Sequence, residues 1–314
     1  MSACLLCGSE LADPLFRASD RLYHTTSREF AVVRCGGCGL LRLDPQPAPS
    51  ELHEYYPDTY WFSPDPSAAS RLEEFYRRVV LRDHVRFVSQ ALAHCQASGP
   101  LLDVGSGGGL FLALMRERGF RAVGLDFSRE AAAISWRRQR APAVCALLEQ
   151  APFREGSLAG LTMFHVLEHL PDPRGYLRAA RGLLAPDGRL VVQVPNSASW
   201  QSRLLGRAWN GMDVPRHLFD FGDRHLATLL EQSGFAIVRR KYFSLRDNPA
   251  GLASSLAPSL DPMARRVRHV QEGPGVRLAR DLAYFALVVS SLPFTLLEAA
   301  FGAGSTVMIE ARRR

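Results

Sequence analysis

A glycine-rich turn in the middle of the chain constrains the fold more strongly than any other feature. An apolar stretch at 100–104 leads into Asp103-Val104-Gly105-Ser106-Gly107-Gly108-Gly109, and a helical pattern follows at 108–118. Glycines where a strand turns into a helix let the backbone approach a ligand closely and present its amide groups at the start of the helix. The next apolar stretch ends at Asp126, about 20 residues on, where a carboxylate suits the hydroxyls of a ribose. These features predict a site for an adenosine-containing cofactor.

The surrounding sequence, from residue 99 to residue 245, alternates short apolar stretches with amphipathic helical patterns. This alternation is typical of an α/β fold with a mainly parallel sheet. Strands are expected near 100–104, 121–126, 143–147, 159–164, 189–194 and 235–243. Helices are expected near 108–118, 128–139, 173–184 and 224–233, with a turn at 185–188 after the third of them. Residues 304–314 are expected to add a final strand to this core.

The position of Asp103 selects among adenosine-containing cofactors. A carboxylate before the first glycine would repel a pyrophosphate but suits the cationic amino and sulfonium groups of S-adenosylmethionine (SAM). The segment 99–245 thereby resembles class I SAM-dependent methyltransferases, whose fold is a Rossmann-like, seven-stranded α/β sheet. The resemblance implies that Asp103 and Gly105 lie near the methionine moiety, that Asp126 binds the ribose and that Phe127 lies beside the adenine. The expected cofactor site is completed by Gly107, Gly109 and His165.

Two histidine-containing segments follow the fourth and fifth expected strands. Ligands of open parallel sheets bind beyond the carboxyl ends of the strands, so these segments, 165–173 and 213–221, should face the methyl acceptor. Both resemble a bacterial group of small-molecule methyltransferases that includes ubiquinone-pathway O-methyltransferases and deoxysugar C-methyltransferases. A hydroxyl or an acidic carbon must lose a proton when it is methylated, and a histidine suits this task. We expect His217 to be the base, with His169 as the second candidate and Glu168 beside it.

The same residues allow a second interpretation. His165, Glu168, His169 and the distant His217 offer the donor types that bind a divalent metal, which would hold the acceptor oxygen. The pattern resembles the Glu-x-x-Glu-His and later His of some metal-dependent O-methyltransferases, although His165 stands where the first glutamate would be. In the structural alternative, Glu168 and His169 begin a helix and shape the SAM pocket, and each histidine caps a helix or bonds a backbone carbonyl.

Four cysteines near the N-terminus form two Cys-x-x-Cys pairs, Cys4 with Cys7 and Cys35 with Cys38, separated by 27 residues. Paired knuckles of this kind can fold back to present four thiolates in a tetrahedron. Four protein ligands fill the coordination sphere of zinc, so the metal would be structural. We therefore expect a zinc ribbon at residues 1–45. The deoxysugar enzymes that the chain resembles carry such a module, and we expect it to cover the active site or to hold a small substrate.

Two further regions lie outside the expected core. Residues 46–98 begin with prolines and continue as an aromatic and then helical stretch, which predicts a linker and a helical cap. Residues 246–303 contain several arginines and then an apolar stretch at 283–301 that a proline and a glutamate interrupt. Such an insertion would pack as a helical hairpin on its own domain or on a second copy of the chain, or would rest in the plane of a membrane through residues 265–301.

The net charge of +7 gives little information on partners, because Lys241 is the only lysine and the arginine excess can reflect genomic composition. The N-terminus shows no secretory leader, which favours a cytoplasmic protein and leaves membrane association open. Residues 1–45 lack a basic stripe interleaved with aromatic residues, so we expect a small-molecule acceptor and no nucleic acid. The oligomeric state stays open.

The sequence as a whole predicts SAM-dependent methyl transfer to an O or C atom of a sugar, a secondary metabolite or a lipid-linked precursor. Two alternatives stay open. An RNA methyltransferase would use the zinc ribbon and the surplus arginines to bind its substrate. A non-catalytic SAM-binding protein would act as a partner in a biosynthetic complex.

Overall fold

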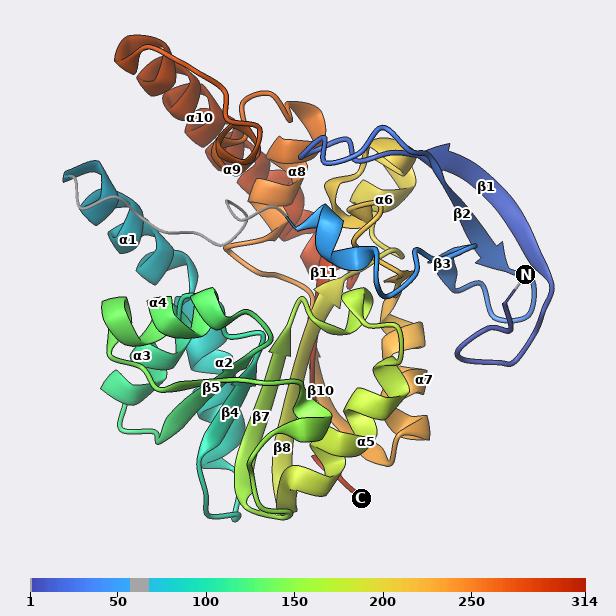
Figure 1. Ribbon diagram of the computed structural model, residues 1–314, viewed down its shortest axis with the longest axis vertical. Coiled ribbons are helices and arrows are strands. Elements are labelled where there is room, and N and C mark those ends of the chain that lie inside the picture. The colour runs from blue at the N-terminus through green and yellow to red at the C-terminus, as the bar shows by residue number, and fades with distance from the viewer. Residues whose placement is uncertain (1, 57–67) are drawn as a thin grey trace.

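The computed structural model describes residues 2–56 and 68–314. Within these residues the chain forms a large central sheet with helices on both faces and a smaller sheet beside the N-terminus (Figure 1). Residues 57–67, which belong to the linker and cap expected at 46–98, lie outside the described part of the chain. The α/β architecture that the sequence predicts is confirmed.

The large sheet has seven strands in the order β10-β11-β8-β7-β4-β5-β6. The strands β4 to β8 run parallel, and β11 is antiparallel to both β8 and β10. The bounds are β4 (Leu101–Val104), β5 (Ala122–Asp126), β6 (Ala143–Cys145), β7 (Leu158–Phe164), β8 (Leu184–Pro195), β10 (Phe235–Lys241) and β11 (Thr306–Arg313). Each strand lies where the sequence pattern predicts one, and the seven-stranded sheet is the one that the family resemblance implies.

The strand β8 begins earlier than its sequence pattern indicates. Leu184 pairs with Leu158 of β7, whereas the sequence predicts a helix to residue 184 and a turn at 185–188. The side chain of Leu184 is fully buried, which favours its place in the sheet. The register then shifts, so that residues 185–188 form a bulge before regular pairing resumes at Arg189.

Alternate residues of the central strands point to opposite faces of the sheet, and helices cover each face. Leu101 packs with α2 (Arg82–Ala93) and α3 (Leu110–Glu117). Leu102 belongs to the opposite layer, which contains α5 (Pro173–Leu183) and α7 (Asp223–Gln232). The helix α4 (Arg129–Gln139) follows β5 and contacts both β5 and β6. The sheet is therefore buried on both sides, as is usual for parallel strands joined by helices.

Two of these helices begin at capping residues on the carboxyl side of the sheet. The hydroxyl of Ser128, before α4, accepts a hydrogen bond of 3.2 Å from the backbone N–H of Ala131. The carboxylate of Asp172, before α5, accepts one of 2.9 Å from Gly175. Pro173 suits the first turn of α5, because an N–H at that position has no partner within a helix. The loops that follow β5 and β7 therefore end at Ser128 and Asp172.

The smaller sheet joins the cysteine-rich segment to the core. It contains β1 (Ala12–Ala18), β2 (Phe30–Cys35), β3 (Leu41–Leu43) and β9 (Phe219–Asp220), in that order, and all its strands are antiparallel. The strand β9 comes from the segment that the sequence assigns to the core. The N-terminal module, residues 2–45, therefore depends on a much later part of the chain to complete its sheet.

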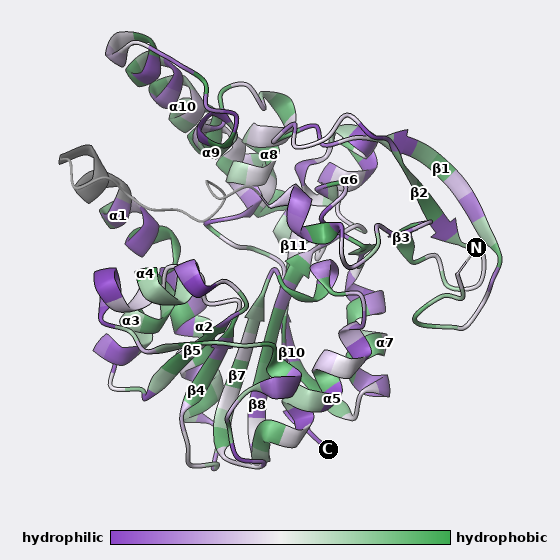
Figure 2. Cartoon of the chain, viewed as in Figure 1, coloured by the Kyte–Doolittle hydropathy of each residue, from purple (hydrophilic) through white to green (hydrophobic). Residues whose placement is uncertain are grey.

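The regions expected as a helical cap and an insertion are both helical. The cap contains α1 (Ala68–Val80) and α2, which a turn at Leu81 separates. The insertion contains α8 (Asn248–Leu256), α9 (Pro262–Val267) and α10 (Pro274–Ala300). The helix α10 projects from the body of the molecule (Figure 1), and Figure 2 shows apolar segments along its length between hydrophilic turns.

Short helical segments fill the loops at the carboxyl edge of the sheet. They are α6 (Trp200–Leu205) and the 3-10 turns η1 (Leu52–Tyr55), η3 (Leu148–Gln150), η4 (Leu167–His169), η5 (Gly206–Ala208) and η6 (Asn210–Met212). The turn η4 directly follows β7, and η6 directly precedes the second histidine-containing segment, 213–221. Both segments that the sequence assigns to the acceptor thus lie at this edge.

The buried guanidinium of Arg216 joins the N-terminal module to the core. It donates two hydrogen bonds of 2.9 Å to Asp20, and two of 2.9 and 2.6 Å to Asp213. It also donates to the carbonyl of Tyr55 at 3.1 Å and lies 4.6 Å from the ring centre of Tyr23. Burial raises the pKa of Asp20, but the hydrogen bonds and charge of Arg216 outweigh it and lower the pKa to about 2. Two carboxylates from distant segments thereby share one buried cation.

Replacing Arg216 with methionine should destabilise the protein by about 3–5 kcal/mol, because Asp20 and Asp213 would keep buried charges without a partner. Urea unfolding measures this change. The matched control is Arg17→Met, since Arg17 and Glu29 form an exposed pair whose loss should cost less than about 1 kcal/mol. Similar stability of the two variants would contradict the role of Arg216.

The ion pair between Arg216 and Asp20 also makes the free energy of unfolding depend on pH. The contribution of Asp20 is complete above its unfolded pKa of about 4 and is lost as the pH falls towards its folded pKa of about 2. The loss should therefore appear in acid unfolding of the wild type and be reduced in Arg216→Met.

Candidate active site

The glycine-rich turn connects β4 to α3 at the carboxyl edge of the large sheet. Gly105, Gly107 and Gly109 have φ angles of 72°, 49° and 77°, in the left-handed region that favours glycine. A side chain at Gly105 would collide with Val166, and one at Gly109 would collide with Ser135. Conformation and available space therefore both require glycine at these two positions.

Asp126 supports this turn from the end of β5. Its two carboxylate oxygens accept hydrogen bonds of 2.9 Å from the backbone N–H groups of Gly107 and Ser128. Burial raises the pKa of Asp126, and these two bonds oppose the rise. Asp126 thus orders the glycine turn and also lines the cavity beside it.

Asp103 lies beneath the turn and is only 3% exposed. One of its oxygens accepts a hydrogen bond of 2.6 Å from the hydroxyl of Thr162. Burial raises the pKa of Asp103, and the charge of Asp126 adds to the effect, so that the pKa reaches about 7 despite the bond from Thr162. A cation bound nearby would favour the ionised form of this carboxyl group.

A cavity of about 250 Å³ opens beside the glycine turn. Four residues that the sequence assigns to the cofactor line it, namely Gly105, Asp126, Phe127 and His165, and His169 lines it as well. The remaining lining side chains are mainly apolar or aromatic: Tyr56, Val104, Leu125, Ala146, Leu148, Val166, Leu170 and Tyr176. The expected cofactor side and the expected acceptor side therefore meet at one cavity.

Tyr56 is a lining residue that the sequence analysis did not identify. Its hydroxyl lies 2.9 Å from Nδ1 of His169, and its ring meets that of Phe127 edge-on, with centroids 6.4 Å apart. The neighbouring Tyr55 is held by Arg216, which places Tyr56 at the cavity. The aromatic pair after the proline-rich segment is the sequence signal that could have pointed to this residue.

Glu168 lies in η4, immediately beyond β7, and is 1% exposed. Its Oε1 accepts a hydrogen bond of 3.2 Å from Nδ1 of His165, whereas its buried Oε2 has no hydrogen-bond partner among the described residues. Burial raises the pKa of Glu168, but the bond from His165 and the charges of nearby histidines lower it overall. One oxygen of a buried carboxylate is therefore available to a ligand.

His169 faces the cavity, and His217 lies behind it. Their rings meet edge-on, with centroids 4.6 Å apart. Nδ1 of His169 lies 3.1 Å from the carbonyl oxygen of Arg216, and burial together with the charge of His217 lowers the pKa of His169 to about 4. Nδ1 of His217 donates to the carbonyl of Gly211 at 2.9 Å. Within the described part of the chain, His169 lines the cavity and His217 does not.

Three of the four candidate metal ligands come together. One donor atom each from Glu168, His169 and His217 lies within 4.8 Å of the others, and the unpartnered Oε2 of Glu168 fits this set. A carboxylate with two imidazoles suits divalent transition metals. His165, the fourth candidate, is engaged elsewhere, because its Nε2 lies 3.6 Å from Asp247.

Asp247 connects the insertion to the site, and the sequence analysis did not identify it. Its Oδ2 accepts hydrogen bonds of 2.6 Å from Gln193 and from Ser244. Burial lowers the pKa of His165, but the charge and hydrogen bonding of Asp247, with help from Glu168, raise it to about 9. His165 thus lies between two carboxylates that raise its pKa, and its Nε2 lies 2.9 Å from the side-chain nitrogen of Gln193.

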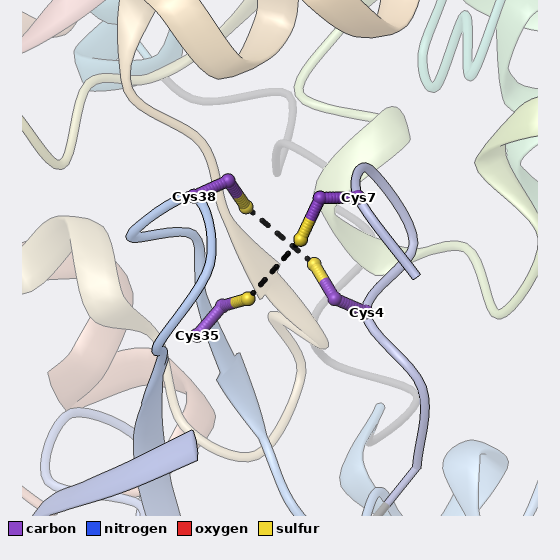
Figure 3. Close-up of side chains that lie close together, drawn as sticks. All are labelled: Cys4, Cys7, Cys35 and Cys38. Carbon is purple, nitrogen blue, oxygen red and sulfur yellow. Dashed lines mark hydrogen bonds between the residues drawn. The ribbon is translucent and has the colours of Figure 1, made fainter. Parts of the chain in front are cut away.

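The four N-terminal cysteines converge as the sequence predicts (Figure 3). Sγ of Cys4 lies 3.6 Å from Sγ of Cys38, Sγ of Cys7 lies 3.5 Å from Sγ of Cys35, and all four lie within 4.8 Å of one another. Four sulfurs bound to one zinc ion at about 2.3 Å would be about 3.8 Å apart, so this arrangement fits zinc. Burial raises the pKa of Cys4 and of Cys38, whereas backbone N–H groups of Cys38 and Gly37 help to lower that of Cys35 to about 6.

Comparison with known proteins identifies the family. A family model described as a methyltransferase domain matches residues 70–240, which is more than half of the chain. The chain belongs to the methyltransferase-domain family. Its glycine turn and seven-stranded sheet are those of a class I SAM-dependent methyltransferase, as the sequence resemblance implies.

Individual methyltransferases are similar to this chain over part of its length. The ubiquinone biosynthesis O-methyltransferase of Sodalis glossinidius is 29% identical over 38% of this chain and 51% of its own length. The protein of the same name from Cronobacter sakazakii is 27% identical over 51% of this chain and 70% of its own length. The chain thus spans about half of the first relative.

A solved structure shows the same fold. A SAM-dependent methyltransferase from Archaeoglobus fulgidus matches with a TM-score of 0.50 and 18% identity, over 79% of this chain and 100% of that chain. At this level of identity the likeness concerns the fold alone. The choice of acceptor therefore has to be argued from the residues of this chain.

If Asp103 contacts the cationic groups of SAM, as the family resemblance implies, the affinity for SAM should fall by about tenfold between pH 8 and pH 6, because a carboxyl group with a pKa of about 7 attracts a cation only when it is ionised. Calorimetric titration with SAM at several pH values measures this dependence. In Asp103→Asn the affinity should be lower at pH 8, and the dependence on pH should disappear. An affinity in the wild type that stays constant over this range would show that Asp103 does not contact the cationic groups.

Proposed function

We propose that this methyltransferase transfers the methyl group of SAM to an oxygen or an acidic carbon of a small molecule. The observation that carries the proposal is the shared cavity, in which the glycine turn and Asp126 lie on one side and His169 with Tyr56 on the other. Bound SAM supplies an activated methyl group. The protein then has to align the acceptor with that methyl group and take up the proton that the acceptor loses.

His169 is the base that we propose for this step, and His217 packs against its ring from behind. A pKa of about 4 keeps His169 in its neutral form at neutral pH. The carboxylate of Glu168 favours the protonated ring, whereas a charge on His217 opposes it. The sequence analysis ranks His217 first, and the place of His169 on the cavity wall supports the reverse order.

A metal ion offers a second route to the same transfer. If Glu168, His169 and His217 bind a divalent ion, that ion would hold the acceptor oxygen and favour its ionised form. The unpartnered oxygen of Glu168 supports this route. The two imidazoles would then act as ligands, so removal of the metal would abolish transfer while both histidines stay in place.

The lining of the cavity supports a small and partly apolar acceptor. Leu148, Leu170 and Tyr176 line the same cavity as His169. The relatives named for ubiquinone biosynthesis are O-methyltransferases, and the sequence also resembles deoxysugar C-methyltransferases. We therefore include a sugar, a secondary metabolite and a lipid-linked precursor among the candidate acceptors.

We also propose that the N-terminal module binds one structural zinc ion. Four cysteine ligands would leave no coordination position for a substrate. The loops of the cluster rest on the core, because Arg174 donates hydrogen bonds of 2.9 and 2.7 Å to the carbonyl of Leu5 and His225 bonds that of Cys38 at 3.0 Å. Zinc would thereby stabilise the module that presents Asp20 to Arg216.

His169→Ala should lower the rate of methyl transfer by about 100-fold or more, because the acceptor would lose its base. His217→Ala should cause a smaller loss. The assay follows labelled methyl groups from SAM into a panel of hydroxylated and acidic-carbon compounds, and calorimetry with SAM checks that the cofactor site is intact. His94→Ala is the matched control, because the side chain of His94 is exposed and bonds the carbonyl of Gln90 one helix turn away.

The outcomes of this assay separate the alternatives. Full activity in both active-site variants would exclude these histidines as bases. Loss of wild-type activity on chelation, restored by a divalent ion, would favour the metal route. Labelling of added RNA but of no small molecule would indicate an RNA methyltransferase, and SAM binding without any transfer would indicate a non-catalytic partner.

Purified protein should contain one zinc ion per chain, as measured by elemental analysis. Cys4→Ser combined with Cys35→Ser should remove the zinc and lower the melting temperature by roughly 10 °C, because the metal organises a segment that has little core of its own. Cys145→Ser is the control, since Cys145 is an exposed cysteine outside the cluster. Wild-type protein that folds without bound metal and melts at the same temperature after chelation would disprove the zinc assignment.

A further inference from the structure

The side of α10 that packs on the protein is mainly polar, and the opposite side is apolar. Its buried positions, Val288, Ser291, Thr295 and Glu298, follow three- and four-residue spacing and therefore form one stripe. Three of these four side chains are polar. Glu298 accepts hydrogen bonds of 2.9 Å from the backbone N–H and the side-chain amide of Gln201 in α6. The polar stripe is thus the side that packs on the protein.

The opposite side of α10 is apolar and largely exposed, with one edge-on ring contact between Phe285 and Tyr76 of α1, whose centroids are 6.5 Å apart. Eight large apolar side chains on the helix and at its end are between 46% and 69% exposed: Val276, Leu278, Leu282, Phe285, Val289, Leu296, Leu297 and Phe301. With 3.6 residues per turn, they occupy roughly half of the circumference, and the charged residues of the helix project from the other half. A helix that faces water shows the reverse pattern.

The length of α10 permits two orientations towards a membrane. Among residues 2–56 and 68–314, it is the one helix long and apolar enough to cross a bilayer. A crossing helix would have to take Glu298 away from Gln201 and into lipid, which is costly for a carboxylate. A helix that lies along the surface keeps its polar stripe on the protein and places only the apolar half in lipid. The second orientation preserves every contact of the stripe.

Arginines stand at both ends of the apolar half. Arg277, in the first turn, has a side chain that is 74% exposed. At the other end, Arg203 and Arg224 line a cavity of about 520 Å³ together with Phe301. Neither Arg203 nor Arg224 forms an ion pair or a side-chain hydrogen bond within the described part of the chain. Positive groups beside an exposed apolar helix complement the phosphates of anionic lipids.

We propose that α10 binds the surface of an anionic phospholipid membrane, with its apolar half among the acyl chains and with Arg203 and Arg224 at lipid phosphates. The helix projects from the body (Figure 1), which makes its apolar half accessible to a flat surface. This half is wider than the narrow stripe along which two helices pair, and the arginines that flank it would repel their counterparts in a second copy. The proposal does not depend on which acceptor the enzyme methylates.

Flotation with lipid vesicles tests the proposal. Wild-type protein should float with vesicles of phosphatidylcholine and phosphatidylglycerol and bind about tenfold less to phosphatidylcholine alone. Leu282→Glu, Phe285→Glu and Val289→Glu together should abolish flotation, because three carboxylates would have to enter the acyl region. The pair Arg203→Ala and Arg224→Ala should remove the preference for phosphatidylglycerol and leave weak binding.

The control variant is Val238→Glu, since Val238 is an apolar side chain of β10 that is exposed to a similar extent, 48%. It should float like the wild type. Binding of SAM and thermal unfolding check that each variant is folded, and Phe285→Gln with Val289→Gln provides a milder change if the glutamates impair folding. Wild-type protein that does not float would overturn the proposal. So would a stable dimer without lipid that the same substitutions dissociate, because a second copy would then cover α10.

Discussion

The buried cation of Arg216 is the interaction on which the arrangement of the active site depends. It binds Asp20 of the N-terminal module, Asp213 of its own loop and the carbonyl of Tyr55. Tyr56 follows Tyr55 in the chain, so the same contact sets one wall of the cavity. The backbone carbonyl oxygen of Arg216 lies next to the ring of His169. The N-terminal module is therefore a structural support of the active site and not an independent appendage.

Features that depend on nearby residues could be predicted from the sequence. The glycine turn, the ends of the strands and the two cysteine pairs each follow from local spacing, and the structure brings Gly105, Asp126 and Phe127 to one cavity as expected. The bulge at 185–188 is a small exception. There, burial of Leu184 in the sheet prevails over the helical pattern that precedes it.

Contacts between distant segments could not be predicted from the sequence. Asp20, Tyr56 and Asp247 each stand in a loop or at the end of a helix, where polar and aromatic residues are common, and no spacing links them to their partners. Which of His169 and His217 is the better candidate for the base also could not be predicted from the sequence. Residue type makes both suitable bases, and only the path of the loop before Arg216 places one ring behind the other.

The insertion shows how an apolar sequence can be ambiguous. A buried core helix and a helix that faces lipid have the same composition, so the apolar stretch at 283–301 is compatible with both. The difference lies in its few polar residues. Ser291, Thr295 and Glu298 are turned towards the protein, and this orientation becomes visible only when α6 and α10 are seen together.

The position of β11 in the large sheet has a consequence for synthesis on the ribosome. This strand lies between β8 and β10, yet it is the last strand of the described chain. Until residues 306–313 have left the ribosome, β8 and β10 each expose an edge with unpaired backbone groups, to which another nascent chain could add a strand. In the smaller sheet, β3 likewise lacks its partner until β9 has been synthesised. A chain halted before β11 would therefore expose open sheet edges and be prone to aggregation, and the pairing of β11 with β8 and β10 closes the core.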